Sequence, residues 1–328
     1  MTVFTFMLTA VQAKDWVTYE GKAGPGKGKH IVLLSGDEEY RSEEALPQLA
    51  KILSQRHGFT CTVLFSVDAQ GFIDPNAGAS LTYAGALDTA DAIVMSLRFR
   101  HWNEDAMQRF EGALKRGIPL IALRTSTHAF NGFPKGSPWE KWNCGHRGGF
   151  GKQVLGEAWV SHWGHHKYEA TRGLVEAAAK DEAVLRGVMD IFGTTDVYEA
   201  APPADAKILV RGQVLKGMRS TDAPADHKKK TAASVEQGVN DPMMPVAWTR
   251  EYTNESGTVN RILCTTMGAA TDLESEGLRR LVVNGVYWGL GLDVPAKANV
   301  EVVGEFKPTM FGFGGAKKGL KPSDYELP

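Results

Sequence analysis

The sequence predicts an α/β protein built on a doubly wound, mostly parallel sheet. Three observations support this prediction: short apolar runs alternate with amphipathic helical segments over residues 29–126, glycines close the helical segments, and the apolar runs end in polar side chains. Such alternation favours a parallel sheet with right-handed crossovers. Ligands bind at the carboxyl ends of the strands in open sheets of this kind, so the polar strand ends are the first candidates for a site.

The first unit begins with an apolar strand at residues 30–35, followed by the acidic turn Asp37, Glu38 and Glu39. A helix is expected over 42–56, because apolar residues recur at helical spacing after Ser42 and stop before Gly58. Acids at this turn either complement the helix dipole or contact a ligand, and dipole complementation is the expected role for at least two of them.

The same alternation continues along the chain. Further strands are expected at 59–67, 91–97 and 118–123, with helices at 81–90 and 104–117. The strand at 118–123 is a short apolar run typical of a buried parallel strand, and it breaks into a polar segment that ends at His128. In a flavodoxin-like strand order, the first, third and fourth strands are near neighbours, so their polar ends should share one cleft.

Regularity is lost after this point. Residues 129–163 are rich in Gly, Trp and His, and this long insertion is too aromatic to be read as disordered. The later elements are expected to be strands at 194–198, 208–215, 244–252 and 261–267, helices at 181–188 and 275–290, and a mobile segment at 220–240. The tail, 293–328, is expected to wrap the surface without adding chemistry.

Composition limits the class of protein. The chain has 328 residues and a formal net charge of −1, which gives no electrostatic footprint for nucleic acid, and we expect one main domain at 30–292. The basic run 227–230 is interpreted as a solvated loop. A homo-oligomer is compatible with the sequence.

The N-terminus predicts export. Residues 1–13 are apolar and end in Val-Gln-Ala, which resembles a signal peptide too short to span a bilayer, and a linker is expected at 14–29. The predicted location is therefore periplasmic or secreted, with a cytoplasmic protein as the alternative and no membrane span in the mature chain.

Histidines are concentrated in one part of the sequence. Five of the nine lie within 127–167, and imidazoles so close together could hold Zn²⁺ or a similar divalent cation through His162, His165 and His166. His165 and His166 are adjacent, so in an extended chain they point to opposite sides and cannot share one metal. The alternative reading is that each histidine forms hydrogen bonds or contacts a substrate.

Covalent acyl transfer is disfavoured, because the chain lacks both G-x-S-x-G and G-x-C-x-G at a strand-to-helix turn. His128 is instead predicted to be a general acid or base, with Arg124 and Glu39 as its catalytic partners. Arginines would bind a carboxylate, phosphate or polarised carbonyl, and tryptophans would stack on sugar rings. The expected substrate-binding residues are Asp37, Glu38, Tyr40, Arg98, Arg100, Trp102, Ser126, Thr127, Trp163 and Asp272.

Several motifs in combination resemble the ThuA-like (trehalose-utilisation) family. They comprise Leu-Leu-Ser-Gly with Glu-Tyr-Arg at 33–41, Leu-Arg-Thr-Ser-Thr-His-Ala-Phe at 123–130, Gly-His-His with Thr-Arg-Gly-Leu at 164–174, Asp-Val-Tyr-Glu at 196–199, and Pro-Val-Ala-Trp-Thr-Arg-Glu-Tyr at 245–252. The resemblance implies a flavodoxin-related fold of the class I glutamine amidotransferase-like superfamily without its catalytic cysteine. It also implies sugar catabolism by way of 3-keto-glycosides made by a partner oxidoreductase.

The sequence departs from the family pattern in two places. Asp37 and Glu38 stand where a histidine is common at the first strand end, and Gly268-Ala269-Ala270 replaces a Gly-His pair after the last strand. The expected function is acid/base-assisted cleavage or isomerisation of a (3-keto-)glycoside. A non-catalytic carbohydrate-binding protein is the main alternative, favoured by the two missing histidines, and an amidotransferase-type hydrolase is the weaker one.

Overall fold

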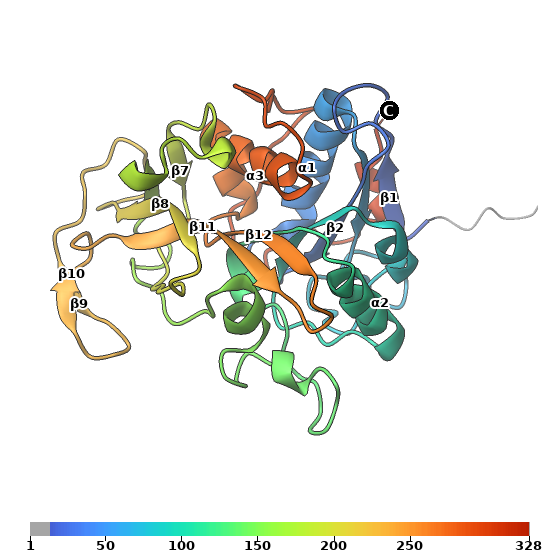
Figure 1. Ribbon diagram of the computed structural model, residues 1–328, viewed down its shortest axis with the longest axis horizontal. Helices are drawn as coiled ribbons and strands as arrows, with labels where there is room; N and C mark the ends of the chain where they lie inside the picture. Colours follow the sequence, from blue (N-terminus) through green and yellow to red (C-terminus); the bar gives the residue numbers. More distant parts are fainter. Residues whose placement is uncertain (1–13, 328) are drawn as a thin grey trace, which may run out of the picture.

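A ten-stranded sheet forms the centre of the protein in the computed structural model, which describes residues 14–327 (Figure 1). Its strands lie in the spatial order β1 (Trp16–Tyr19), β3 (Thr60–Leu64), β2 (His30–Gly36), β4 (Ala92–Leu97), β5 (Leu120–Leu123), β12 (Val259–Thr265), β11 (Met244–Thr253), β8 (Lys207–Val214), β6 (Thr171–Val175) and β7 (Ile191–Gly193).

The parallel part of this sheet confirms the predicted fold class. Strands β3, β2, β4, β5 and β12 pair in parallel, and they are the second, first, third, fourth and fifth of the parallel strands along the chain. This is the flavodoxin-like order. The remaining pairs are antiparallel and extend the sheet at both edges.

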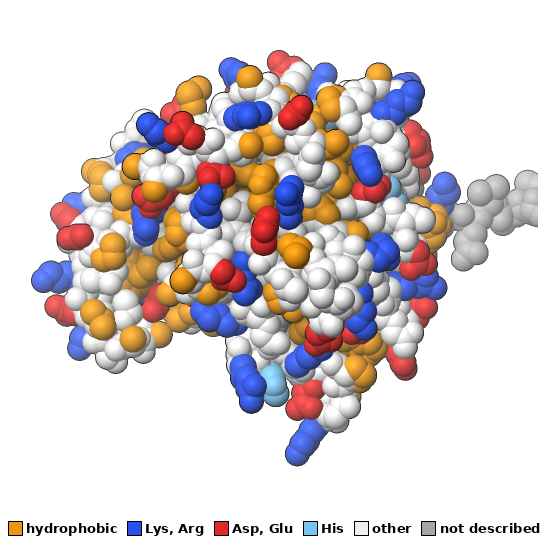
Figure 2. Space-filling view, viewed as in Figure 1, with side chains coloured by type: hydrophobic (Ala, Val, Ile, Leu, Met, Phe, Trp, Pro, Cys, Tyr) orange, Lys and Arg blue, Asp and Glu red, His pale blue; other side chains and the backbone are white. Residues whose placement is uncertain are grey.

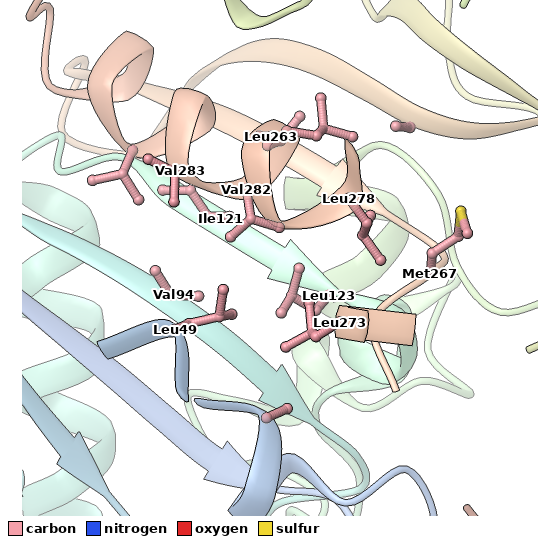
Figure 3. Packing of buried hydrophobic residues seen from close by; sticks show 14 of the residues in the cluster. Leu49, Val94, Ile121, Leu123, Leu263, Met267, Leu273, Leu278, Val282 and Val283 are labelled. Carbon is pink, nitrogen blue, oxygen red and sulfur yellow. The ribbon is translucent and has the colours of Figure 1, made fainter. Parts of the chain in front are cut away.

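Helices cover both faces of the parallel strands. One core joins the sheet to α1 (Ser42–His57) and α3 (Glu276–Gly289), and a second core joins the other face to α2 (Glu104–Lys115). Figure 3 shows the first of these cores, where Ile121 and Leu263 on the strands lie beside Val282 and Val283 of α3. The doubly wound arrangement therefore follows from apolar stripes on both sides of a buried sheet.

The helix ends follow the sequence signals. The side chain of Asn103 accepts a hydrogen bond from the Ala106 amide at 3.0 Å and so caps α2. Ser275 caps α3 in the same way, through the amide of Leu278 at 3.3 Å. Helix α1 ends at Gly58, whose φ of 81° is the left-handed conformation that glycine adopts without strain.

The long insertion packs as a layer on the α2 face. Trp142 and Phe150 pack against Phe110 of α2 and against Phe130, mostly edge-on or tilted, at ring-centroid distances of 5.2 to 5.9 Å. Aromatic packing of this kind orders a segment that has little regular secondary structure.

Several elements differ from the sequence predictions. The helices expected at 81–90 and 181–188 are short 3-10 turns, Ala84–Thr89 and Ala183–Leu185. No strand forms at 194–198, because this segment is held instead by side chains such as Asp272, which accepts from the Thr195 amide at 3.0 Å. The segment expected to be mobile contains the hairpin β9 (Lys228–Lys230) and β10 (Glu236–Gly238).

The two terminal segments are more involved in the fold than expected. The predicted linker contains β1, which pairs with β3 at the sheet edge, and the Tyr19 hydroxyl donates to the Tyr325 carbonyl of the tail at 2.6 Å. The predicted signal peptide, 1–13, lies outside the described residues.

The surface carries no single dominant charge in the view of Figure 2, where basic and acidic side chains are interspersed. Over residues 14–327, none of the helices combines the length and the apolar character needed to cross a bilayer.

Candidate functional site

The polar ends of β2, β4 and β5 meet at one edge of the sheet, as the strand order requires. They surround a small pocket of about 50 Å³, to which the later segments contribute the other wall. Larger hollows of about 250 and 300 Å³ lie away from these strand ends and contain neither His128 nor its neighbours. The pocket is lined by Glu39, Tyr40, Arg98, Phe99, His128, Trp159, His162 and Tyr198.

His128 lies in this pocket, at the end of the 3-10 helix Arg124–His128 that follows β5. Its Nδ1 is 3.2 Å from the Thr127 hydroxyl, and its ring contacts those of Phe99 and Trp159 at centroid distances of 5.2 and 5.7 Å. Burial lowers the pKa of His128 well below its ordinary value, and the charges of Arg98 and Arg124 add to the effect. The imidazole is therefore neutral at physiological pH, as a general base must be.

Glu38 joins the two arginines that follow β4. Its carboxylate lies 2.9 Å from Arg98 Nη1 and 3.1 Å from Arg100 Nη2. Arg100 is buried and also donates to the Pro75 carbonyl at 2.9 Å, so it supports the site from below and does not line the pocket. Arg98 does line the pocket, and its guanidinium lies over the Phe99 ring at 4.3 Å.

Arg124 occupies the sharp strand-to-helix turn with a φ of 44°, the place where a nucleophile elbow would carry its nucleophile. Its guanidinium is completely buried, 2.8 Å from Asp196 Oδ1, and donates to the carbonyls of Asp196 and Thr266. The rings of Tyr40 and Tyr198 flank it at 4.6 and 3.7 Å. Arg124 therefore corrects the sequence prediction: it holds other residues in place and does not reach the pocket.

Asp196 is the centre of a hydrogen-bonded chain that sequence reasoning missed. His162 Nδ1 lies 2.8 Å from Oδ2, and His166 Nδ1 lies 3.1 Å from Oδ1. His166 Nε2 continues the chain to Glu39 Oε1 at 3.0 Å. Burial alone would raise the pKa of Asp196, but Arg124 and the two imidazoles lower it below its usual range. The bonds to Asp196 and Glu39 raise the pKa of His166 to about 9.

Phe99, Trp159 and Tyr198 were also missed as pocket residues. Trp159 has 41% of its surface exposed and lies beside both His128 and His162, so it offers the open aromatic face that Trp102 and Trp163 were expected to supply. The only signal for Asp196 and Tyr198 in the sequence was the Asp-Val-Tyr-Glu motif at 196–199, since neither residue follows a predicted strand of the parallel sheet.

Two expected substrate-binding tryptophans are core residues. Trp163 is fully buried and donates from Nε1 to the Val239 carbonyl at 2.9 Å. Trp102 is buried edge-on against Phe110 and Phe130. Core packing is the usual role of a large aromatic residue, and it removes both from the list of substrate contacts.

Four expected polar contacts are also buried structural groups. Asp37 accepts from the amides of Glu39 and Tyr40 at 2.7 Å and shapes the turn after β2. Ser126 donates to the Met95 carbonyl at 3.0 Å, and Asp272 accepts from the Thr195 hydroxyl at 2.6 Å. Thr127 is buried too, and its hydroxyl donates to the Arg124 carbonyl at 3.5 Å and lies beside His128 Nδ1. These hydrogen bonds satisfy groups that burial would otherwise leave without partners.

The C-terminal tail reaches this site, contrary to the expectation that it adds nothing there. Phe311 is buried against the rings of Tyr40 and His166 at 5.2 and 5.5 Å. The Gly312 amide donates to the Glu39 carbonyl at 2.9 Å. Phe313 is 60% exposed, with the Arg98 guanidinium 5.1 Å from its ring centroid.

The three histidines predicted to share a metal are divided between two groups. His162 and His166 face Asp196, whereas His165 faces away, with its Nδ1 3.2 Å from Glu169 Oε2. The group at Asp196 is a poor fit for a divalent cation, because the buried Arg124 guanidinium already neutralises its carboxylate at 2.8 Å. The predicted set of His162, His165 and His166 is therefore not a single metal site in this structure.

Comparisons with known proteins give structural neighbours only. No family model matches the chain, and no curated protein matches it. A ThuA-like protein from Parabacteroides merdae is 14% identical with a TM-score of 0.47, and the match covers 92% of this chain and 100% of that one. One from Bacteroides uniformis is 13% identical with a TM-score of 0.48, covering 82% and 94%. These low values assign no activity, and both neighbours bear the name of the ThuA-like family, which the motifs of this chain resemble.

Proposed function

We propose that the chain acts on a carbonyl-bearing sugar derivative, such as a 3-keto-glycoside, by acid/base catalysis in the pocket around His128. One observation carries the proposal: a neutral imidazole and a guanidinium, those of His128 and Arg98, line the same pocket as the exposed Trp159. Proton abstraction next to a carbonyl requires a base and a group that stabilises the oxyanion, and an open aromatic face suits stacking on a sugar ring. Sugar as the substrate class rests on the resemblance to the ThuA-like family.

The proposed reaction begins when His128 takes the proton from the carbon next to the carbonyl. The electron pair of the broken C–H bond forms a carbon–carbon double bond, the π pair of the carbonyl moves to its oxygen, and Arg98 stabilises the resulting enediolate. For isomerisation, a proton moves between the two oxygens of the enediolate and His128 returns its proton to the former carbonyl carbon. For cleavage, the oxyanion pair re-forms the carbonyl, the C=C pair shifts to the adjacent carbon–carbon bond, the bond to the glycosidic oxygen breaks, and that oxygen leaves with a proton from an acid in the pocket. His162, oriented by Asp196 at 2.8 Å, is the second proton carrier in the pocket.

The pocket volume limits what can be held at one time. About 50 Å³ is far below the few hundred Å³ of a pocket that encloses a whole small ligand. The reacting part of the sugar would occupy the pocket, and the rest would extend past Trp159 and Phe313, which are both exposed at its rim.

Replacement of His128 by Gln tests the proposal. We expect kcat/KM on a 3-keto-glycoside to fall by about 10²- to 10⁴-fold, because the substitution removes the base and keeps a polar side chain of similar size. His146→Gln, in the insertion and outside the pocket lining, is the matched control and should retain full activity. Unchanged turnover by a folded His128→Gln variant would reject this mechanism.

The second candidate is a carbohydrate-binding protein without catalysis. It is favoured by the two departures from the family pattern. Asp37, at the first position, accepts hydrogen bonds within a turn, and Ala269 and Ala270, at the second, are buried and carry no titratable group. Saturable binding of sugars without product, by mass balance, would select it. The amidotransferase alternative lacks a nucleophile at the strand-to-helix turn, where Arg124 lies. Labelling of Ser126, or of the free Cys144 in the insertion, by a covalent probe would support it.

Export is part of the same proposal and rests on residues 1–13 alone. Processing after Ala13 would leave a mature chain that begins at Lys14, and N-terminal sequencing of the protein from its native source would test this.

A further inference from the structure

We propose that His165, Glu169 and His227 form a binding site for a borderline divalent cation such as Zn²⁺, separate from the pocket of His128. One ligand atom from each of the three residues lies within 4.8 Å of the others. His165 Nδ1 is 3.2 Å from Glu169 Oε2, and His227 Nδ1 is 3.5 Å from Glu169 Oε1. Two imidazoles and one carboxylate are a ligand set that Zn²⁺ uses, with water completing the tetrahedron.

Two segments of the chain supply these three residues. The Glu169 amide donates to the His165 carbonyl at 2.9 Å, so a single helical turn places both side chains on one side. His227 comes from the segment just before β9, where its carbonyl accepts from the Val239 amide at 3.0 Å. The site would therefore tie the segment that carries His162 and His166 to the base of the β9–β10 hairpin.

Charge distinguishes this group from the one at Asp196. Within residues 14–327, the ion pairs of Glu169 are with His165 and His227 only. Asp196 instead pairs with the buried Arg124 guanidinium. When both imidazoles are neutral, the group at Glu169 keeps a net negative charge in a largely buried carboxylate, and a cation would compensate it.

The present spacing requires a small rearrangement. Zn–N and Zn–O bonds are about 2.0 to 2.2 Å long, so ligand atoms in one shell lie closer together than the 4.8 Å limit seen here. The rings of His165 and His227 are stacked, with centroids 4.8 Å apart, and one ring must turn for both nitrogens to face the ion. The His165 side chain is 61% exposed and can do so.

No hydrogen bond among the described residues holds the ring of His227, whose Nδ1 lies 3.5 Å from Glu169 Oε1 as an ion-pair contact. Its Nε2 is buried and has no partner among the described residues. A buried ring nitrogen without a partner is costly, and coordination of an ion through Nε2 would satisfy it.

Titration of the metal-free, untagged chain with Zn²⁺ in competition with a chromophoric chelator tests the proposal. We expect one equivalent of Zn²⁺ to bind, and His165→Ala and His227→Ala each to weaken its affinity by about tenfold or more, because each removes one of three ligands. Glu169→Gln should weaken it similarly while it keeps the side-chain shape.

Two control variants locate the ion. His146→Ala removes a histidine outside both groups, and His162→Ala disrupts only the group at Asp196, so both should bind Zn²⁺ like the wild type. Circular dichroism of the metal-free variants would show that each is folded. Wild-type affinity in folded His165→Ala and His227→Ala, or a loss confined to His162→Ala, would overturn the proposal.

Discussion

Two histidine groups lie within a few residues of each other in the sequence and have opposite electrostatic character. His162 and His166 bond to Asp196, a fully buried carboxylate neutralised by Arg124. His165 contacts Glu169, a buried carboxylate whose ion pairs among the described residues are with partly exposed histidines only. The first group is a closed network that positions the pocket, whereas the second has a carboxylate available to an ion. The distances between possible ligand atoms do not distinguish the two groups. The Arg124 guanidinium beside Asp196 does.

The two histidine groups also differ in whether the C-terminal tail covers them. Phe311 packs on His166, with ring centroids 5.5 Å apart, while the His165 side chain is 61% exposed. Burial strengthens each electrostatic contact and makes an unpaired group costly, so changes in the first group should have much larger effects than the same changes in the second.

The largest expected effect is the loss of one buried carboxylate charge. Asp196→Asn leaves the Arg124 guanidinium buried without its counter-charge, which we expect to cost about 3 to 5 kcal/mol in free energy of unfolding. Glu169→Gln makes the same chemical change without leaving a buried guanidinium unpaired, and the new amide oxygen can still accept from the His165 backbone amide, so it should cost only about 1 kcal/mol in metal-free protein. Urea denaturation of the two variants measures both losses in free energy of unfolding. Equal losses would show that the two groups do not differ in this way.

The next effect concerns the cover over the first group. Phe311→Ala removes a buried ring from the surfaces of Tyr40 and His166 and should cost about 3 kcal/mol. The neighbouring Phe313 is 60% exposed, so Phe313→Ala should cost less than about 0.5 kcal/mol. Urea denaturation measures the two losses of stability, and the rate of proteolysis in the tail measures how firmly it is held. Similar proteolysis rates for the two variants would show that Phe311 does not anchor the tail.

The smallest effect is a pH dependence of stability centred on His128. Folding lowers the pKa of this imidazole, so below about pH 6.5 the unfolded chain binds a proton that the folded chain resists. Stability should therefore fall as the pH drops below this value. His128→Gln should make the fall shallower, as measured by denaturation from pH 7.5 to 5. An unchanged slope would mean that His128 is not protected by the fold.

The sequence predicted well what depends on local pattern. The apolar run before Arg124 and the helical spacing after Ser42 are each set within one segment, so the parallel order and the place of His128 at a strand end were accessible.

Burial was harder to predict than position. Ser126 and Asp272 were expected to meet a substrate because they follow strands, but each is used by a backbone or side-chain partner of the fold. A polar residue after a strand looks the same in sequence whether it faces the pocket or a neighbouring segment.

The sequence by itself determined the α/β class, the doubly wound order and the strand end that carries His128, because hydrophobic periodicity and turn residues act over short distances. Only the tertiary structure decided that Arg124 pairs with Asp196, 72 residues away, and that His227 joins His165 and Glu169. The physical reason is that a charge takes its role from what lies within a few ångströms of it, and those neighbours come from parts of the chain that no local pattern connects.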